Sequence, residues 1–427
     1  MKKTREEIVE VSKLVHGGQG LGLLPDGKKV FAWGALPGEK VLVRLTKSKR
    51  DWAEGYVVEV IEPSKDRIDP EEPSIYLATS PWQILNYKIE ASFKQHILNE
   101  AFEREGVEVN WQLFYQPKEP FNYRNKMEYN FWFFTDTNQV SLALHRRGSH
   151  QKVAVEGSLL ASNEINNAGK ALIKYINDNA IEARPLKSVI LRSDLSGRVG
   201  ISLFVNDKNI KDSFNSFSHD NSIFEIVYSN PKSPASVTTE VLLPNDKPLT
   251  DILLGRKFDY STRSFFQVNI PVYEKVLEII KNEIKDDKKD ILDMYSGVGS
   301  IGLSVVGKNQ KLTMVEVSEE STDQAKKNMA GLENCEVVTA TSESALNYIT
   351  SDSTIILDPP RAGLHKVVVE KLTEEKPTKI IYLSCNPSTQ ARDVKMLLEA
   401  GYKISYAQGF NFFPRTPHIE NLFVLEI

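Results

Sequence analysis

The sequence has very little cysteine and no long apolar run. Cys335 and Cys385 are its two cysteines in 427 residues, too few for a disulfide framework or a cysteine-rich zinc site. No apolar segment is long enough to cross a bilayer, and the charged first residues are unlike a secretory signal. We therefore expect a cytoplasmic protein with reduced thiols, no membrane partner and no bound metal.

A strong charge of one sign is also absent. The net charge is −4, and contents of 41% hydrophobic and 26% charged residues are typical of folded soluble domains. A length of 427 residues suits two or three such domains. The charge is uneven, however, because residues 118–152 hold six Lys/Arg, among them Arg124 and Lys126, against three acids, together with many aromatics. This segment is either an RNA-binding surface or a β-rich domain with an aromatic core.

The first two thirds of the chain have a β-rich pattern. Residues 8–62 hold short alternating runs separated by turn dipeptides such as Asp26-Gly27 and Pro37-Gly38, which predicts a five-stranded barrel of the OB type. Residues 61–73 are rich in proline and charge, as linkers are, and residues 86–106 predict a helix. Residues 121–245 predict mostly strands, with one helix near residues 161–180.

From about residue 270 the pattern changes to apolar strands that alternate with amphipathic helices. This alternation predicts a doubly wound α/β domain with a mainly parallel sheet. In such sheets ligands bind at the carboxyl ends of the strands. Four motifs follow the predicted strands and are therefore candidates for a single site.

The first motif is "LDMYSGVGSIGL" at residues 292–303. Gly297, Gly299 and Gly302 form a G-x-G-x-x-G pattern, which by itself is weak evidence for a dinucleotide site. Asp293 precedes the loop and Glu316 ends the next strand. A carboxylate before the loop would repel a pyrophosphate but suits a cationic ligand, which favours S-adenosylmethionine over NAD.

The second motif is "STIILDPPRAGL" at residues 353–364. Asp358 ends a predicted strand and is followed by two prolines, which fix the turn. Asp358 is either a capping residue or a carboxylate at a base-binding site. The D-P-P pattern at this place is typical of nucleic-acid methyltransferases.

The third and fourth motifs are "YLSCNPSTQARD" at residues 382–393 and "FFPRTPHIENL" at residues 412–422. Cys385 ends a strand and precedes a predicted helix, whose N-terminus is expected to stabilise a thiolate. Cys385 is thus a candidate nucleophile, whereas Cys335 has the pattern of an inert buried thiol.

With these motifs the sequence resembles the S-adenosylmethionine-dependent RNA uracil-5-methyltransferases, over nearly its whole length. Residues 5–62 look like the TRAM domain of that family, and "FNYRNKMEY" and "SFFQVN" are similar to its central-domain and cofactor motifs. The most specific matches are "SCNP", "DPPR" and a P-x-T-x-H-x-E motif made by Pro414, Thr416, His418 and Glu420.

The resemblance implies an α/β plus β fold in three domains. A TRAM domain of the OB type is expected at residues 1–64 and a mixed α+β RNA-binding domain at 65–262. Residues 263–427 are expected to form a class I methyltransferase domain with a doubly wound sheet.

The resemblance also implies a mechanism. The thiolate of Cys385 adds to C6 of uracil and makes C5 nucleophilic, C5 takes the methyl group of S-adenosylmethionine, and Glu420 removes the C5 proton. Asp358 bonds the uracil edge close to the cofactor methyl. The target base must leave its stack to reach the site.

Further residues are assigned by the same resemblance. Those expected to bind the cofactor are Gln267, Tyr295, Glu316 and Asp358, joined by Ser300 and Thr341. Those expected to contact RNA are Arg124, Lys126, Arg361 and His418, although Arg361 and His418 suit a surface or capping role equally well.

The sequence departs from the family at two places. Many relatives that act on ribosomal RNA carry a cysteine-ligated iron-sulfur cluster, but Leu77, Ser80 and Ser158 or a neighbour stand at the ligand positions here. We therefore expect no cluster. Asn411 replaces a frequent aspartate, and its role is left open.

The substrate is expected to be 23S rRNA, because tRNA-specific bacterial members usually lack the TRAM domain. A tRNA uridine-54-type activity is the alternative, and one or two target uridines remain open. A catalytically silent RNA-binding or assembly protein, and an NAD-dependent oxidoreductase that rests on the glycines alone, are the competing classes. We expect a monomer.

Overall fold

The chain divides into two units, and a computed structural model describes residues 5–149, 151–245, 247–285 and 289–427 of it. Unit 1 comprises Met1–Phe93, Lys118–Lys247 and Phe413–Pro417. Unit 2 comprises Lys94–Pro117, Pro248–Phe412 and His418–Ile427. Each unit is thus assembled from segments that are distant in sequence. The first four residues, part of the charged start considered above, lie outside the described residues.

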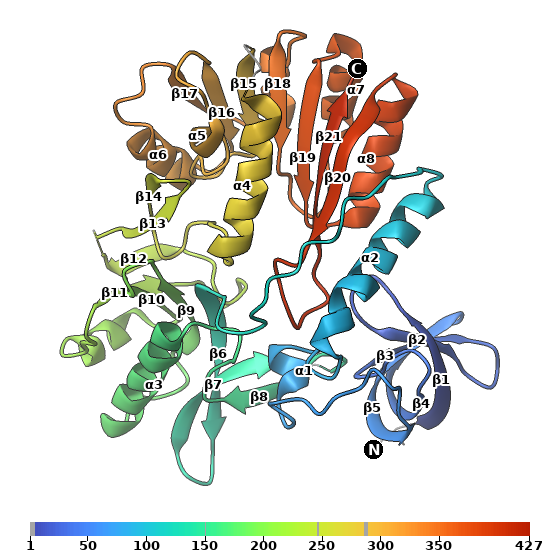
Figure 1. Ribbon diagram of the computed structural model, residues 1–427. Helices are drawn as coiled ribbons and strands as arrows, with labels where there is room; N and C mark the ends of the chain where they lie inside the picture. Colours follow the sequence, from blue (N-terminus) through green and yellow to red (C-terminus); the bar gives the residue numbers. More distant parts are fainter. Residues whose placement is uncertain (1–4, 150, 246, 286–288) are drawn as a thin grey trace. The chain divides into compact units, whose positions relative to one another are not determined.

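Unit 1 begins with a closed barrel, drawn in blue in Figure 1. Its strands are β1 (Glu6–Leu14), β2 (Gly20–Leu23), β3 (Lys29–Trp33), β4 (Lys40–Ser48) and β5 (Trp52–Glu62). The ring closes because β1 pairs with both β2 and β4, while β5 pairs with β3 and β4. Alternate apolar side chains such as Val9, Val41 and Val43 fill its core. The predicted OB-type barrel is confirmed.

The segment after the barrel is packed against it. Glu39 is buried, and its Oε2 accepts a hydrogen bond from Arg67 Nη2 at 2.8 Å. Arg67 Nη2 also donates to the carbonyl oxygen of Gly34 at 2.7 Å. The linker-like residues 61–73 are therefore held to the barrel at Arg67, and α1 (Tyr76–Thr79) and α2 (Tyr87–Arg104) follow.

The rest of unit 1 is built on a second sheet, of strand order β12-β11-β10-β9-β6-β7-β8 in the described part of the chain. The strands are β6 (Lys126–Phe134), β7 (Gln139–His145), β8 (Lys152–Val155), β9 (Leu186–Ser193), β10 (Val199–Val205), β11 (Ser222–Tyr228) and β12 (Glu240–Leu243). The helix α3 (Asn163–Asp178), capped by Ser162, packs on β7, β9 and β10. A 3-10 turn, η1 (Lys208–Phe214), follows β10.

The aromatic-core interpretation of this segment is confirmed in part, and its RNA-binding interpretation stays a prediction. Tyr129 and Phe131 are buried in the core under α3. Trp132, Phe133 and Phe134, which end β6, are exposed by 37–40%. The aromatic pattern therefore combines a core with an exposed strand end.

Unit 2 contains a sheet of strand order β17-β16-β15-β18-β19-β21-β20 within the described ranges. The strands are β15 (Asp290–Met294), β16 (Leu312–Glu316), β17 (Cys335–Thr339), β18 (Ser353–Leu357), β19 (Lys379–Ser384), β20 (Lys403–Phe410) and β21 (Glu420–Glu426). β15 to β19 are mutually parallel and β21 is antiparallel to its neighbours. The predicted mainly parallel sheet is confirmed.

Helices cover this sheet in two layers. Besides residues 94–104 of α2, the described part of unit 2 contains the helices α4 (Ile270–Ile284), α5 (Gly302–Val305), α6 (Glu319–Asn328), α7 (Lys366–Glu375) and α8 (Pro387–Glu399). The short elements are β13 (Leu249–Leu253), β14 (Arg256–Tyr260), η2 (Ser342–Ser344) and η3 (Leu346–Tyr348). α4 packs with α5, and α7 with α8, as a doubly wound fold requires (Figure 1).

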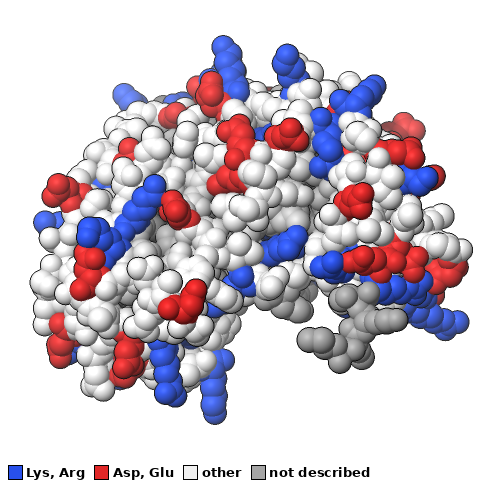
Figure 2. Space-filling model, turned by 90° about the horizontal axis from the view of Figure 1, so that it is seen from below, with Lys and Arg blue, Asp and Glu red and all other residues white. Residues whose placement is uncertain are grey.

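None of the helices in the described ranges is long and apolar enough to span a membrane. Figure 2 shows Lys and Arg side chains interspersed with Asp and Glu over the face drawn. The even mixture agrees with the small net charge of −4.

Candidate active site

The ends of four parallel strands place the predicted residues in one row. β15 pairs in parallel with β16 and β18, and β18 with β19, so their carboxyl ends share one edge of the sheet. The residues that end or follow these strands are, in sheet order, Glu316, Tyr295, Asp358 and Cys385. This edge therefore collects residues of three separate sequence motifs, joined by Glu316.

Cys385 and Glu420 lie opposite each other on neighbouring strands. Ser384 of β19 pairs with Asn421 of β21 in antiparallel register. One further step of that register sets Cys385 against Glu420, the first residue of β21. A thiol and a carboxyl 35 positions apart in sequence thus meet at the edge of the sheet.

The surroundings of Cys385 differ from the expectation. The side chain is half-buried, and burial, followed by the charges of Glu420 and Asp358, raises the pKa of the thiol to about 12. Attraction to Arg361 lowers this pKa, but less strongly. The N-terminus of α8 follows Cys385, as predicted, whereas burial and the two carboxyls raise the pKa of the thiol.

The two carboxyls beside the thiol are also perturbed. Burial raises the pKa of Asp358 to about 7, although solvent still reaches part of the side chain. Burial, and then the charge of Asp358, raise the pKa of Glu420 well above its usual range, while Arg361 opposes this effect. Once ionised, such a carboxylate is a stronger base than a solvated one.

Asp293 and the glycine loop form the next part of the site. Asp293 Oδ2 accepts a hydrogen bond from the Gly302 amide at 2.8 Å, whereas Oδ1 is buried with no partner among the described residues. Burial raises the pKa of Asp293 to about 7. Gly297 has φ of 56°, and a Cβ there would meet open space. The buried carboxyl of Asp293, the partly buried Asp358 and an open loop fit a cationic cofactor such as S-adenosylmethionine.

Tyr295 and Glu316 flank this loop. Tyr295 has φ of 65°, and its hydroxyl donates to Ser342 Oγ at 3.0 Å. Glu316 accepts hydrogen bonds from the Gly297 amide at 3.0 Å and the Ser318 amide at 2.8 Å. The carboxylate of Glu316 therefore fixes the loop, and strain at Tyr295 is held where a ligand is expected.

The remaining residues predicted to bind the cofactor, Gln267, Ser300 and Thr341, differ in burial and in hydrogen bonding. Gln267 is buried in the loop before α4. Ser300 Oγ lies 2.8 Å from the Tyr273 hydroxyl within the glycine turn. Thr341 is exposed, and its hydroxyl lies 2.9 Å from Ser344 Oγ in its own turn. The contacts of Thr341 therefore give it a local structural role.

Arg361 and His418 meet beside the thiol. Arg361 is exposed, and its Nη2 lies 3.2 Å from His418 Nδ1. Arg361 also lowers the pKa of both Cys385 and Glu420 by charge attraction. The structure thus brings Arg361 and His418 together, with the Arg361 guanidinium close enough to Cys385 and Glu420 to affect their pKa values.

Arg124 and Lys126 belong to unit 1. Arg124 is half-buried, its guanidinium lies 5.8 Å from the centre of the Phe413 ring, and its Nε has no hydrogen-bond partner among the described residues. Lys126 begins β6 and pairs with Arg192 of β9.

Two of the three residues at the expected cluster-ligand positions are polar, and the third, Leu77, is buried and apolar. Ser80 and Ser158 are both buried. Ser80 Oγ accepts a hydrogen bond from Gln83 Nε2, which also donates to Glu72 Oε2 at 2.7 Å. Ser158 Oγ accepts a hydrogen bond from the Leu160 amide at 3.2 Å. Among the described residues no group of three or more His, Cys, Asp or Glu could hold a metal ion. Asn411 is buried and accepts a hydrogen bond from Lys94 Nζ at 2.6 Å.

Two residues of the site were not assigned from the sequence. Asp293 was interpreted as an acid that suits a cationic cofactor, but it was not among the residues assigned to bind that cofactor. Asn386 stands inside the quoted "SCNP" motif, and its side chain caps α8 by accepting from the Ser388 amide at 3.2 Å. An asparagine before a proline is a usual helix start, and this signal could have identified it.

Comparison with known proteins identifies two family models that match this chain. The model of the tRNA (Uracil-5-)-methyltransferase family matches residues 86–427, and that of the TRAM domain matches residues 3–58. An uncharacterized RNA methyltransferase of Clostridium tetani is 28% identical over 447 residues, which cover 99% of this chain and 98% of the relative. One of Enterococcus faecalis is 29% identical over 458 residues, covering 100% and 98%.

A solved structure is similar over nearly the whole chain. It is the tRNA (uracil-54, C5)-methyltransferase of Pyrococcus abyssi in complex with S-adenosyl-L-homocysteine. The TM-score is 0.77 at 24% identity, and the alignment covers 98% of this chain and 100% of the other. This likeness shows a common fold.

Proposed function

Because the chain belongs to the tRNA (Uracil-5-)-methyltransferase family, we propose that it methylates C5 of a uridine in 23S rRNA through a covalent intermediate on Cys385. Members of this family are S-adenosylmethionine-dependent RNA methyltransferases, and this chain is one of them. The opposition of Cys385 and Glu420 across β19 and β21 is the observation that carries the proposal, since a nucleophile and a base are needed at adjacent ring carbons.

In the first step the sulfur electron pair of Cys385 forms a bond to C6 of uracil. The C5–C6 π pair moves to C5 and O4, and the thiol proton passes to solvent water before the attack. Arg361 supports this step because its positive charge favours the thiolate. Asp358, when ionised, accepts a hydrogen bond from N3–H of the uracil edge.

In the later steps the ring gains a methyl group and loses a proton. When bound, S-adenosylmethionine supplies the electrophilic methyl group to C5. Glu420 then takes the C5 proton, the electron pair of the C5–H bond re-forms the C5–C6 double bond, and the C6–S bond breaks to release the Cys385 thiolate. Burial of Glu420 strengthens it as a base once it is ionised.

The preference for 23S rRNA rests on the TRAM domain, and RNA binding in general is supported by the surface of unit 1. Arg146 lies 4.4 Å from the centre of the Tyr56 ring, and Lys47 lies 4.9 Å from that of Trp52, within unit 1. Such pairs can stack bases and hold phosphates. The Pyrococcus abyssi enzyme acts on tRNA, which keeps a tRNA uridine as the second candidate substrate. We also propose that the protein acts as a cytoplasmic monomer in three parts, at residues 1–64, 65–262 and 263–427.

The proposal is tested with 23S rRNA and tRNA transcripts that carry tritium at C5 of every uridine. After addition of S-adenosylmethionine, we expect tritium release to water from 23S rRNA and none from tRNA. Release from tRNA alone would transfer the activity to that substrate. Binding of both RNAs without release of tritium from either would favour the silent RNA-binding alternative. Calorimetry with S-adenosylmethionine and with NAD tests the oxidoreductase alternative, which is excluded if S-adenosylmethionine binds and NAD does not.

A further inference from the structure

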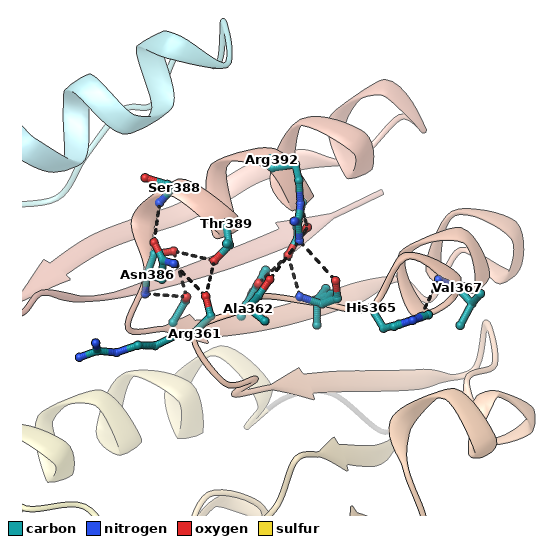
Figure 3. Close-up of polar contacts among 12 residues, drawn as sticks. Arg361, Ala362, His365, Val367, Asn386, Ser388, Thr389 and Arg392 are labelled. Carbon is teal, nitrogen blue, oxygen red and sulfur yellow. Dashed lines mark hydrogen bonds and ion pairs between the residues drawn. The ribbon is translucent and has the colours of Figure 1, made fainter. Parts of the chain in front are cut away.

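The loop that follows Asp358 is held almost entirely through its main chain. Pro359 and Pro360 lack amide donors, so the carbonyl groups after them must bind the loop to its surroundings. Arg361 O accepts a hydrogen bond from Asn386 Nδ2 at 2.8 Å and one from Thr389 Oγ1 at 3.3 Å. Figure 3 shows Asn386 and Thr389 pointing toward the Arg361 main chain, whereas the Arg361 side chain extends away from this network.

The asparagine makes two bonds that fix its amide in one orientation. Asn386 Oδ1 accepts from the Ser388 amide and caps α8, so Nδ2 is turned toward Arg361 O. Asn386 is also the residue after Cys385. The side chain of Asn386 therefore connects the start of α8, which follows Cys385, to the main chain of Arg361.

The next turn of α8 holds the rest of the loop. Arg392 Nη2 donates to the carbonyl oxygens of Ala362 at 3.4 Å and Leu364 at 3.3 Å (Figure 3). Asp393 is buried and accepts from the Leu364 amide at 2.9 Å. Gly363 has φ of 78°, and a Cβ there would lie 2.8 Å from Asp393 Oδ2, so the loop packs closely on the helix.

We propose that Asn386 and Thr389 are positioning residues, which hold the main chain of Arg361 so that its guanidinium lies beside Cys385 and Glu420. The "DPPR" and "SCNP" motifs then act as one unit, in which the helix after the nucleophile sets the place of the cation. This inference rests on the proposed function for the role of Cys385, and on the hydrogen bonds alone for the positioning.

The test uses Asn386→Ser, Thr389→Val and their combination in the full-length chain. Serine remains a good N-cap but cannot reach Arg361 O, and valine removes only a hydroxyl. Thr373→Val is the matched control, because Thr373 Oγ1 also donates to a carbonyl oxygen, that of Glu370 on α7. Each change is made with Arg361 present and in an Arg361→Met background.

We expect the double variant to lower kcat/KM by about ten- to a hundredfold with Arg361 present. In the Arg361→Met background it should add less than about twofold, because the residue to be positioned is gone. The control should do nothing in either background. Equal losses in both backgrounds would overturn the proposal, since they would show a structural role that does not act through Arg361.

A second arm needs neither RNA nor turnover. The rate of Cys385 alkylation by iodoacetamide, followed by mass spectrometry of its peptide, should fall about threefold or more in the double variant and in Arg361→Met, because a displaced cation leaves less thiolate. Cys335 in the same digest is the internal standard. Unchanged alkylation of Cys385 in both variants would also overturn the positioning role. A fall without methylation of any uridine would retain it and reject the proposed function instead.

Discussion

Two arginines of the quoted sequence motifs, Arg415 and Arg361, have opposite surroundings. Arg415 is buried in unit 1, where its guanidinium donates to the carbonyl oxygens of Leu85 at 2.8 Å and Gln83 at 2.7 Å. Its amide donates to both oxygens of Glu90, at 3.0 and 3.1 Å. Arg361 is exposed, and among the described residues its guanidinium has His418 as its one hydrogen-bond partner.

The difference separates an arginine that stabilises the fold from one that is available to a ligand. Most donors of Arg415 are used by protein acceptors, and its φ of 64° is a strained conformation that those bonds maintain. Arg361 keeps most of its five N–H donors for a substrate. We therefore expect loss of Arg415 to lower stability and loss of Arg361 to lower activity.

The largest effect is expected at Glu420, which follows the loop of Arg415. Glu420→Gln removes the base but leaves the thiol, so the covalent adduct should form and persist. Turnover should fall by about a thousandfold or more, while a protein–RNA species that resists SDS accumulates with unmodified RNA. Glu426→Gln, at the other end of β21, is the control and should turn over normally. A fall in turnover without accumulated adduct would move the role of Glu420 to an earlier step.

Arg415→Met tests the stabilising arginine. Removal of one partner of the buried pair with Glu90 should lower the free energy of unfolding of unit 1 by about 3–5 kcal/mol, because Glu90 keeps an uncompensated charge. The earliest transition in urea measures this change. Adding Glu90→Leu should restore part of the loss, and a stability unchanged by Arg415→Met contradicts the structural role.

Arg361→Met tests the exposed arginine in the opposite direction. We expect kcat/KM for RNA to fall by about ten- to a hundredfold. The free energy of unfolding, measured in urea, should change by less than about 0.5 kcal/mol. Steady-state kinetics and unfolding are measured on the same preparation. If Arg361→Met unfolds as easily as Arg415→Met, the distinction between the two arginines is wrong.

The pH dependence follows from Asp293 and Asp358, whose pKa values are raised to about 7. In the unfolded chain both carboxyls have a pKa of about 4. Between about pH 4 and pH 7 the folded state therefore binds more protons than the unfolded state, and the contribution of these carboxyls to stability falls as the pH rises through this window. A cationic cofactor needs them ionised, so its affinity should increase from pH 6 to pH 8. Calorimetry at pH 6 in buffers of different ionisation enthalpy should show proton release on binding, reduced in Asp358→Asn. Proton uptake would contradict this assignment.

The smallest effect is expected at Arg124, half-buried beside the Phe413 ring in unit 1. Arg124→Met should weaken RNA binding by about threefold to tenfold and reduce the slope of log K against log salt by about one. Filter binding at several salt concentrations measures both. Lys174→Met on the exposed face of α3 is the control, and an unchanged slope for Arg124→Met would remove Arg124 from the RNA surface.

Much of this arrangement could be predicted from the sequence because local patterns determine it. Turn dipeptides marked the barrel, and strand–helix alternation placed Asp358 and Cys385 at strand ends. The pairing of Cys385 with Glu420 depends on the antiparallel β21, which no local pattern specifies. The raised pKa of the thiol was missed for a similar reason: the helix start is local in sequence, whereas the burial and the two carboxyls that outweigh it come from the assembled sheet.

Long-range hydrogen bonds were also beyond the sequence pattern. Arg415 occupies an unspecified position of the P-x-T-x-H-x-E motif, and its acceptors lie more than 300 positions earlier. Asn386 has a local signal as a helix cap, but its bond to Arg361 O joins two motifs that sequence reasoning treated separately. Polar networks of this kind can be identified only when the fold brings the segments together.

The central claim is the covalent step at Cys385, and trapping with 5-fluorouridine tests it most directly. Fluorine at C5 cannot be removed as a proton, so after methyl transfer the adduct should persist. We predict an SDS-resistant complex between the protein and fluorinated 23S rRNA that requires S-adenosylmethionine, is absent in Cys385→Ala, and maps by mass spectrometry to the peptide that contains Cys385. A complex that survives in Cys385→Ala, or methylated fluorinated RNA released without any complex, would contradict the mechanism.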